Sequence, residues 1–403
     1  MKRYRILLAA VTMQMCLGAT YAWSVFVLPI KQITAIFQST AQLPFSLFYF
    51  AFPATMIVTG TLLPKIGPRR CAVVGGLLFG GGWMLASMGR FHFAFTILGI
   101  GMMAGIGVGF AYIVPIATCV RWFPRQKGLV TGVAVAGFGG GAALVSYAAG
   151  SLMETVGMSP FATFGLLGVL FLLLVALAGA VMENPPDSGG IVLQRLPVTG
   201  VLRDRAFVFL YLAMFAGLAA GFAVNANMKE LYPGTGVQAG VKAVAAFALA
   251  NAAGRITWGW VFDRGRSVVI LQTNLLFQAA LLLLHGFILR SETGLAAFAA
   301  LAGFNYGGIL VLYASAAAER WGSERLSQIY GWLFSANIPA AASPIVAGIA
   351  FDHLGSFSPV LWGIGGLMAC GAIAIGMLAP LKNSNKTNYK LNHTVTHDHA
   401  EAN

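Results

Sequence analysis

Charged side chains are scarce in this sequence of 403 residues, and acidic ones are the scarcest. Asp, Glu, Lys and Arg together make up 9% of the residues, whereas apolar residues make up 58%; acidic residues number 12 and basic residues 25. A soluble globular domain contains about 25% charged residues. A soluble fold is therefore excluded, and the composition indicates a chain that crosses a lipid bilayer many times.

Cysteine and grouped metal-ligating side chains are also few. The four cysteines fall in apolar runs or at their ends, without the paired spacing of a metal site. His393, His397 and His399 lie in a polar stretch near the C-terminus and are interpreted as solvated or weak metal contacts. No nucleophile with a neighbouring base occurs in the apolar runs. We therefore expect no enzyme activity, no metal site and no cofactor.

Continuous apolar runs of about twenty residues recur along the whole chain, and each is long enough to cross a bilayer as a helix. Helices are favoured over a β-barrel because barrel strands show alternation over about ten residues. The fold class predicted is all-α integral membrane, with twelve transmembrane helices in two pseudo-symmetric six-helix bundles. The runs cover residues 6–30, 44–64, 71–89, 93–119, 128–150, 160–182, 206–228, 239–262, 267–289, 295–318, 327–351 and 357–380.

The basic residues fall mainly on one side of these runs. Nineteen of the 25 lie on the side of the two termini, and only Lys31, Arg90, Lys229 and Arg290 lie on the other. The net charge of +13 thus reflects topology and contact with anionic lipid, and it predicts no nucleic-acid partner. We expect a multi-pass protein of the cell's inner (plasma) membrane with both termini cytoplasmic, and no obligatory protein partner is evident.

The chain divides in the middle, where Glu183-Asn184-Pro185-Pro186 interrupts the apolar pattern. We expect a first bundle over 1–182, a cytoplasmic linker over 183–205, a second bundle over 206–380 and a polar cytoplasmic tail over 381–403. The segments 60–70 and 259–266, which end the second and eighth runs, are similar and indicate a repeat. Their charges are expected to act in gating, unless they are only basic loops. The gating candidates are Lys65, Arg69, Asp263, Arg264 and Arg266.

Arg255 is the one charged residue deep inside a run. It precedes Asp263 by eight residues, which places it about 12 Å into an apolar core about 30 Å thick. No run contains an acidic residue that could pair with it. An anionic ligand is the favoured partner. The alternatives are that Arg255 reaches toward the interface or donates to free carbonyl groups of a neighbouring helix. Asn251, one turn earlier, would share its face and orient it.

Several motifs in this sequence resemble the major facilitator superfamily, and more narrowly its oxalate:formate antiporter branch, which is related to the monocarboxylate transporters. The resemblance covers essentially all twelve runs. Pro64 departs from the pattern, because the superfamily's first cytoplasmic loop usually has an aspartate there. The motifs are Gly18–Ser24, Gly105–Pro115, Arg121–Leu129, Gly132–Gly141, Gly254-Arg255 and Tyr330-Gly331.

The resemblance implies that Arg255 holds a substrate carboxylate, which suits a planar guanidinium that can make two parallel hydrogen bonds. Dicarboxylate carriers of the branch are expected to have a second cation, a lysine, where this chain has Asn337. A second carboxylate would then lack a counterion, so a monocarboxylate is favoured over oxalate. Asn337 could donate to a hydroxyl or keto oxygen, or make a hydrogen bond between helices instead.

Aromatic residues supply the remaining candidates for a cavity wall. Each ring could pack on a small aliphatic anion, and each tyrosine could donate a hydrogen bond. Each could equally be an ordinary core or lipid-facing residue. The candidates are Tyr21, Tyr112, Phe138, Tyr306 and Phe334.

The function predicted is secondary active transport of a small carboxylate, such as lactate, pyruvate, formate or glycolate, by alternating access. Anion exchange is expected to be faster than net uniport, because an empty carrier must occlude an unpaired Arg255. Proton-coupled monocarboxylate transporters have an acidic residue where this chain has Asn251, which disfavours proton symport. The alternatives are an oxalate/formate antiporter, a proton-coupled monocarboxylate symporter and a membrane anion sensor that does not transport.

Overall fold

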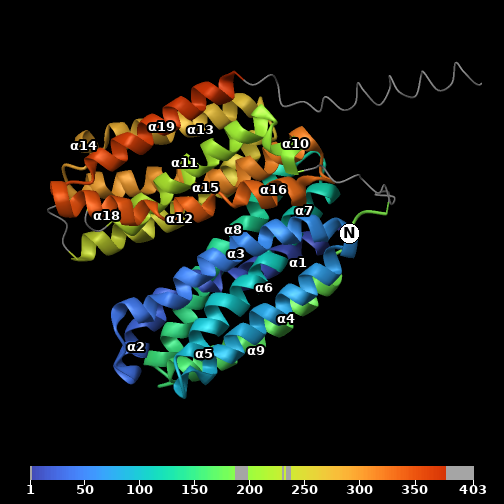
Figure 1. Cartoon of the computed structure of the whole chain (residues 1–403), viewed down its shortest axis with the longest axis vertical. Helices are drawn as coiled ribbons and strands as arrows, with labels where there is room; N and C mark the ends of the chain where they lie inside the picture. Colours follow the sequence, from blue (N-terminus) through green and yellow to red (C-terminus); the bar gives the residue numbers. More distant parts are fainter. Residues whose placement is uncertain (1, 187–197, 229–230, 233–236, 378–403) are drawn as a thin grey trace, which may run out of the picture.

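The chain is helical throughout the residues that a computed structural model describes, which are 2–186, 198–228, 231–232 and 237–377 (Figure 1). Ten helical segments in these ranges are long and apolar enough to cross a membrane. The apolar helices α12 and α13, of 26 and 17 residues, bring the passes to twelve. The expected all-α membrane architecture is confirmed, whereas the expected tail over 381–403 lies outside the described residues.

The first six passes form one bundle, the lower one in Figure 1. Its first pass is α1, η1 and α2 in succession, and its fourth pass is α5, η3, α6 and α7 with a π-helical turn at η3. The elements are α1 (Lys2–Leu17), η1 (Gly18–Trp23), α2 (Ser24–Thr34), α3 (Gln38–Ile66), α4 (Pro68–Ser87), η2 (Met88–Arg90), α5 (Ala94–Thr96), η3 (Ile97–Ala104), α6 (Gly105–Ala111), α7 (Ile113–Trp122), α8 (Lys127–Glu154) and α9 (Pro160–Val181).

The other six passes form the second bundle, which follows the short helix α10 (Val198–Leu202). Its eleventh pass is broken into α16, α17 and α18. The elements are α11 (Arg205–Ala226), α12 (Val237–Phe262), α13 (Ser267–Leu283), α14 (His285–Ile288), α15 (Glu292–Trp321), α16 (Leu326–Phe334), α17 (Asn337–Ala340), α18 (Ser343–Leu354) and α19 (Ser358–Gly376).

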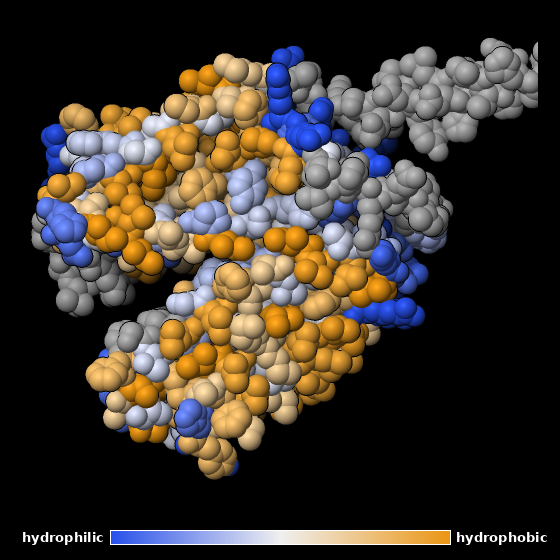
Figure 2. Space-filling view, viewed as in Figure 1, coloured by the Kyte–Doolittle hydropathy of each residue, from blue (hydrophilic) through white to orange (hydrophobic). Residues whose placement is uncertain are grey.

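The two bundles touch at one end and separate at the other. The touching end carries the N-terminus, and we call it the basic end because the loops with Lys65, Arg69, Arg125 and Arg266 lie there. Contacts of α8 with α12 and of α3 with α16 join the bundles. Figure 2 shows a wedge of open space between the bundles at the opposite end and apolar residues along their sides. The molecule therefore has a cleft that opens away from the basic end.

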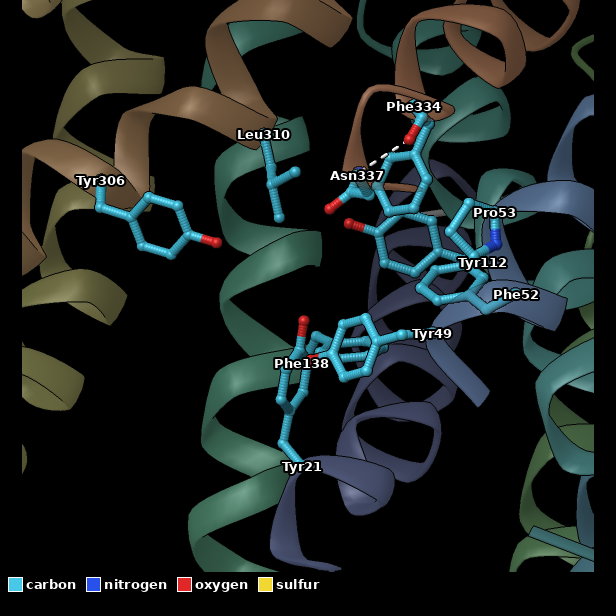
Figure 3. A pocket seen from close by; sticks show the side chains of 10 residues that line it. All are labelled: Tyr21, Tyr49, Phe52, Pro53, Tyr112, Phe138, Tyr306, Leu310, Phe334 and Asn337. Atoms are coloured by element: carbon cyan, nitrogen blue, oxygen red, sulfur yellow. Dashed lines mark hydrogen bonds between the residues drawn. The ribbon is translucent and has the colours of Figure 1, made fainter. Parts of the chain in front are cut away.

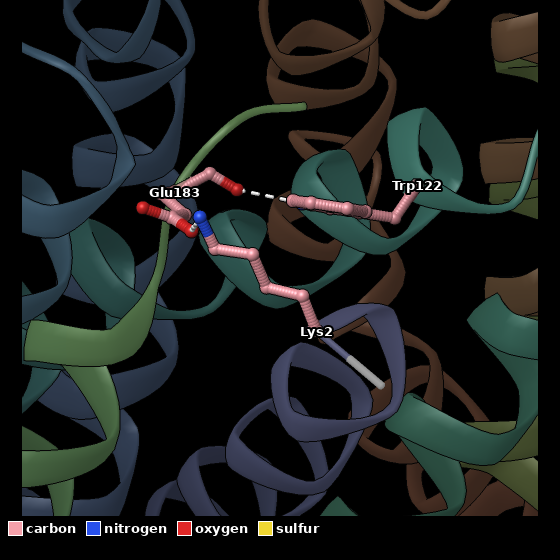
Figure 4. Close-up of polar contacts among 3 residues, drawn as sticks. All are labelled: Lys2, Trp122 and Glu183. Atoms are coloured by element: carbon pink, nitrogen blue, oxygen red, sulfur yellow. Dashed lines mark hydrogen bonds and ion pairs between the residues drawn. The ribbon is translucent and has the colours of Figure 1, made fainter. Parts of the chain in front are cut away.

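Within the first bundle, two polar contacts hold Glu183, at the end of the sixth pass, against the first and fourth passes. Lys2 Nζ lies 2.7 Å from a carboxylate oxygen of Glu183, and Trp122 Nε1 donates to the Glu183 carbonyl oxygen at 2.7 Å (Figure 4). The ion pair is exposed and is worth less than about 1 kcal/mol. Its role is therefore to fix the position of the chain where it leaves the first bundle.

Backbone irregularities occur halfway along the passes, where the bundles face each other. Pro339 lacks an N–H group, and its ring crowds the carbonyl of Ser335, so the eleventh pass breaks between α16 and α18. Pro53 also removes a hydrogen bond, the one to the Tyr49 carbonyl, but α3 continues through it as one helix. Phe334 and Asn337, on either side of the break in the eleventh pass, line the space between the bundles.

Candidate functional site

An aromatic cavity lies between the bundles at the level of Pro53 and of the break in the eleventh pass (Figure 3). Both bundles contribute to its wall, so it spans the interface across which they meet. Six of the eight binding residues predicted from the sequence lie here. The ten lining residues are Tyr21, Tyr49, Phe52, Pro53, Tyr112, Phe138, Tyr306, Leu310, Phe334 and Asn337.

The free space in this cavity is small. About 10 Å³ is open to the centre of a water molecule, which is room for about one water. The rings pack edge to face, with Tyr112 at 5.5 Å from Phe138 and 5.3 Å from Phe334 between ring centroids. A carboxylate of two or three carbons therefore requires some of these rings to rotate or the bundles to shift.

Tyr112 is the buried polar centre of this ring cluster. Its side chain is 1% exposed, and its hydroxyl lies near that of Tyr330 but forms no hydrogen bond of acceptable geometry among the described residues. A buried hydroxyl without a partner costs about 1–3 kcal/mol. The Tyr112 hydroxyl, which Figure 3 shows turned toward Asn337, is thus available to a polar ligand in the cavity.

Arg255 lies beside the cavity and is not among the ten lining residues. It is 6% exposed, and it projects from α12 toward α8 of the other bundle. Its Nε donates to Asn251 Oδ1 at 3.0 Å, and its Nη1 donates to the main-chain oxygen of Val135 at 2.5 Å. Asn251 thus orients the guanidinium from within α12, and the Val135 carbonyl receives it across the interface.

The hydrogen bond to Val135 is the carbonyl contact that the sequence left open as an alternative to a ligand. It uses one of the five N–H donors of the guanidinium, and Asn251 uses another. Nη2 makes no hydrogen bond to any residue in the described ranges, and no carboxylate there lies within 4.0 Å of Arg255. The positive charge is therefore solvated by two neutral groups and is not neutralised.

The charge of Arg255 acts on the tyrosine hydroxyls around the cavity. Its electrostatic interactions reach residues of both bundles, so the cavity lies within the field of the guanidinium. The residues affected are Tyr21, Tyr49, Tyr112, Tyr306 and Tyr330.

Asn337 opens α17 at the break in the eleventh pass and is 6% exposed. Its Nδ2 donates to the Phe334 carbonyl at 2.8 Å, which keeps one donor inside its own segment. Figure 3 shows the amide oxygen turned toward the Tyr112 hydroxyl and the cavity. Asn337 therefore presents an acceptor to the cavity.

Sequence reasoning missed four lining residues, Tyr49, Phe52, Pro53 and Leu310. They lie in long apolar stretches of α3 and α15, where nothing in the sequence separates a cavity-lining ring from a packing ring. Pro53 carried the one usable signal, because a proline inside an apolar run removes a backbone hydrogen bond, although α3 does not break there. Among the described residues, no group of three or more His, Cys, Asp or Glu could hold a metal ion.

Asp263 caps a helix of the opposite bundle at the basic end. One carboxylate oxygen accepts from Gly128 N at 2.7 Å and the other from Leu129 N at 2.8 Å. These are free N–H groups of the first turn of α8, where a negative charge is favourable. Burial raises the pKa of the Asp263 carboxyl, and the two N–H donors oppose that rise, as do Arg264 and Lys127.

The other gating candidates make weaker contacts. Arg264 stacks on Trp260 of its own helix, with 3.9 Å between the guanidinium carbon and the ring centroid. Lys65, Arg69 and Arg266 are exposed, and their side chains make no ion pair or hydrogen bond to a residue that the structure describes. Of the five candidates, only Asp263 joins the two bundles through its side chain.

The sequence matches known membrane transporters over most of its length. The family model described as Major Facilitator Superfamily matches residues 8–233. An uncharacterized MFS-type transporter of Escherichia coli, YhjX, is 27% identical over 82% of this chain and 84% of its own. The oxalate:formate antiporter of Oxalobacter formigenes is 26% identical over 84% and 82%. Apicoplast pyruvate carrier 1 of Toxoplasma gondii is 27% identical over 71% and 65%.

Solved structures show the same architecture. The crystal structure of the transporter FucP in the outward conformation covers 92% of this chain with a TM-score of 0.74 at 16% sequence identity, and 97% of that chain is covered. At this identity the likeness concerns the fold alone.

Proposed function

Because this chain belongs to the Major Facilitator Superfamily, we propose that it is a secondary active transporter that carries small monocarboxylate anions by alternating access. Its relatives and its fold are those of transporters and not of enzymes, and it is an integral membrane protein. The observation that carries the proposal is Arg255, a buried cation without a carboxylate partner among the described residues, beside a cavity between the two bundles.

Arg255, Tyr112 and Asn337 each bind a different part of the ligand. Nη2 of Arg255 offers two charge-assisted donors to a carboxylate. The Tyr112 hydroxyl, which forms no hydrogen bond of acceptable geometry in the described structure, donates to a second oxygen of the ligand. Asn337 Oδ1 accepts from a 2-hydroxyl group, as in lactate or glycolate. The rings of Tyr21, Tyr306, Phe138 and Phe334 pack on the short carbon chain.

One fixed cation favours a monocarboxylate over oxalate. A second carboxylate buried without a counterion costs several kcal/mol. Similarity to a pyruvate carrier supports this choice, and similarity to an oxalate:formate antiporter supports oxalate exchange as the second candidate. The two candidates differ in one measurable quantity, the uptake of oxalate relative to lactate.

Exchange is favoured over net uniport because the partners of Arg255 in this structure are both neutral. Occluding the binding site without an anion buries a net charge, whereas occluding it with a carboxylate buries a neutral pair. We assign the basic end to the cytoplasm of the plasma membrane, since Lys and Arg are retained on that side. The cleft then opens to the exterior.

The test is uptake of formate, acetate, lactate, pyruvate, glycolate and oxalate by proteoliposomes. Arg255→Gln should lower monocarboxylate uptake about 100-fold, because two charge-assisted hydrogen bonds contribute about 3 kcal/mol. Arg255→Lys keeps the charge without the planar fork and should lower uptake about tenfold. Asn337→Lys supplies a second cation and should raise the uptake of oxalate relative to lactate.

The matched control is Lys242→Gln, which removes a cation from the same helix at an exposed position. Its uptake should stay within about twofold of the unsubstituted protein, since long exposed side chains reach the interface. Equal uptake of oxalate and lactate by the unsubstituted protein would reject the one-cation argument. Absence of uptake for all six acids, with binding retained, would favour a sensor. Equal efflux with and without external substrate would reject the preference for exchange.

A further inference from the structure

A second cavity lies on the lateral surface of the molecule at the seam between the bundles. Its volume is about 420 Å³, and helix α11 supplies four of its eight lining residues. Ile57 of α3 contributes from the first bundle, Leu202 from the linker helix α10, and Trp332 of α16 and the following Ser335 from the second bundle. Ser335 lies between Phe334 and Asn337 in the sequence, but no residue lines both this cavity and the aromatic cavity. The lateral cavity, which we call the α11 groove, is thus distinct from the central site.

The α11 groove faces the hydrocarbon of the bilayer. Leu202, Val208 and Leu212 line the groove and are 53%, 37% and 50% exposed. Because α11 crosses the membrane, these exposed apolar side chains face lipid. Ser335 lies ten residues after Arg325, and hence about 15 Å from the basic end of its pass. The groove therefore spans about half of an apolar core about 30 Å thick, the depth of one lipid leaflet.

Two cations adjoin the lining residues nearest the basic end, which we call the mouth of the groove: Arg203 follows Leu202, and Arg205 begins α11. Arg203 and Arg205 are exposed and form no ion pair within the described ranges. Arg205, Val208 and Leu212 follow the helical spacing of three and four residues, so they share one face of α11. Asp204 between the two arginines caps Ala206 N at 2.9 Å and lies 3.9 Å from Arg320, which is a different partner. The mouth is therefore positive.

We propose that the α11 groove binds an anionic glycerophospholipid, with one acyl chain in the groove and the phosphate against Arg203 and Arg205. The wall is compatible with an acyl chain, because it is mainly apolar and its Ser335 hydroxyl is already bonded. Ser335 Oγ donates to the Trp332 carbonyl at 2.7 Å and lies 3.4 Å from the Tyr211 hydroxyl. Apolar fit alone selects no lipid in a bilayer, so the two arginines supply the selectivity for an anionic headgroup.

The groove also links lipid binding to conformation. Ile57 belongs to the first bundle and the remaining lining residues to the linker helix and the second bundle. The groove keeps its shape only while α3 and α16 remain in contact. Lipid bound there contacts both bundles and therefore favours the conformation that is closed at the basic end.

The test is native mass spectrometry of the whole protein with phosphatidylglycerol and phosphatidylcholine of the same acyl chains. The unsubstituted protein should retain phosphatidylglycerol at least about fivefold more than phosphatidylcholine, since each cation near an anionic lipid favours it. Arg203→Gln/Arg205→Gln should abolish this preference. Val208→Phe/Leu212→Phe, which fills the groove, should lower retention of both lipids.

Arg70→Gln/Arg125→Gln is the matched control, because it removes the same charge from exposed positions of the first bundle at the same end. It should keep the preference for phosphatidylglycerol. An equal loss of preference in the control and in the Arg203/Arg205 variant would overturn the site, since only general surface charge would then be at work. Unchanged retention in the groove-filled variant, with the fold intact by circular dichroism, would place the lipid elsewhere. Lipid retention is read without any transport assay, so this result is independent of the substrate.

Discussion

Two helix–helix contacts close the basic end, and we call them the α8–α12 seam and the α3–α16 seam. Both rest on close approach of the backbones, but their side-chain interactions differ. Between α8 and α12, a Cβ at Gly128 or Gly259 would overlap the carbonyl oxygen of the other glycine. Between α3 and α16, a Cβ at Gly60 would overlap the carbonyl oxygen of Ser327. Both seams thus depend on direct contact between helix backbones. Only the first seam adds a carboxylate, Asp263, that caps the facing helix.

The missing carboxylate can be traced to one position in the repeat. Asp263 follows Gly259 by four residues, and Pro64 follows Gly60 by the same spacing. Proline has no group that could accept from the N-terminal N–H groups of α16, and the N-cap of α16 has no side-chain hydrogen bond. Ser327 Oγ donates to the Gly60 carbonyl at 3.1 Å instead. The α8–α12 seam therefore has a carboxylate cap, which we call the latch, whereas the α3–α16 seam has packing and one hydroxyl hydrogen bond.

The largest effect is expected from bulk at the seam itself. Gly259→Val would force α12 away from α8, and overpacking of this kind costs about 1–3 kcal/mol, so the conformation closed at the basic end should lose population about tenfold or more. Spin labels on Arg125→Cys and Arg266→Cys, in a Cys370→Ser background, report the separation of the two loops. The distance distribution should shift to longer values.

The control for this substitution is Gly140→Val on the exposed side of α8, where nothing lies within 4 Å of an added Cβ. Its distance distribution should match that of the unsubstituted protein. A closed basic end that persists in Gly259→Val would mean that the glycine contact does not hold the seam together.

A smaller effect is expected from removing the latch. Asp263→Ala leaves two N–H groups of α8 without acceptors, and loss of such a cap costs about 1 kcal/mol, so the closed population should fall about fivefold in the same distance measurement. The reciprocal change Pro64→Asp offers the α3–α16 seam the carboxylate that it lacks. It should raise the closed population by a similar factor. A fall with Pro64→Asp would show that the two seams are not equivalent.

Most of the fold could be predicted from the sequence, because each helix that crosses a bilayer needs a long apolar run. Every expected run corresponds to a helical pass in the structure, and only internal breaks such as the one at Pro339 divide them further. The closed basic end could not be predicted, because the register of α8 against α12 depends on both bundles at once. Asp263 was identified as a charge near a helix end, but the helix that it caps follows only from that register.

The candidate site, too, could be predicted from the sequence only in part. Tyr21, Tyr112 and Phe138 line the cavity, and all three lie in the motifs that resemble the oxalate:formate antiporter branch. Tyr49 and Phe52 line it without any such signal. The sequence did not decide whether Arg255 donates to a carbonyl group. Every residue offers a carbonyl acceptor, and only the packing of two helices selects the one at Val135.

The smallest effect is expected from acidification, and it also separates the two seams. Burial raises the pKa of Asp263 in the closed conformation, whereas the same side chain exposed to water in an open conformation has its ordinary pKa. The closed conformation then binds the proton more tightly, so lowering the pH through the range between these two pKa values should increase the closed population. The increase depends on one partly buried carboxyl and should be smaller than the effects of the substitutions. Loop distances measured from pH 7 to pH 4 should show it, and Asp263→Asn, which cannot titrate, should abolish it. A shift of equal size in Asp263→Asn would assign the pH response to groups outside the latched seam.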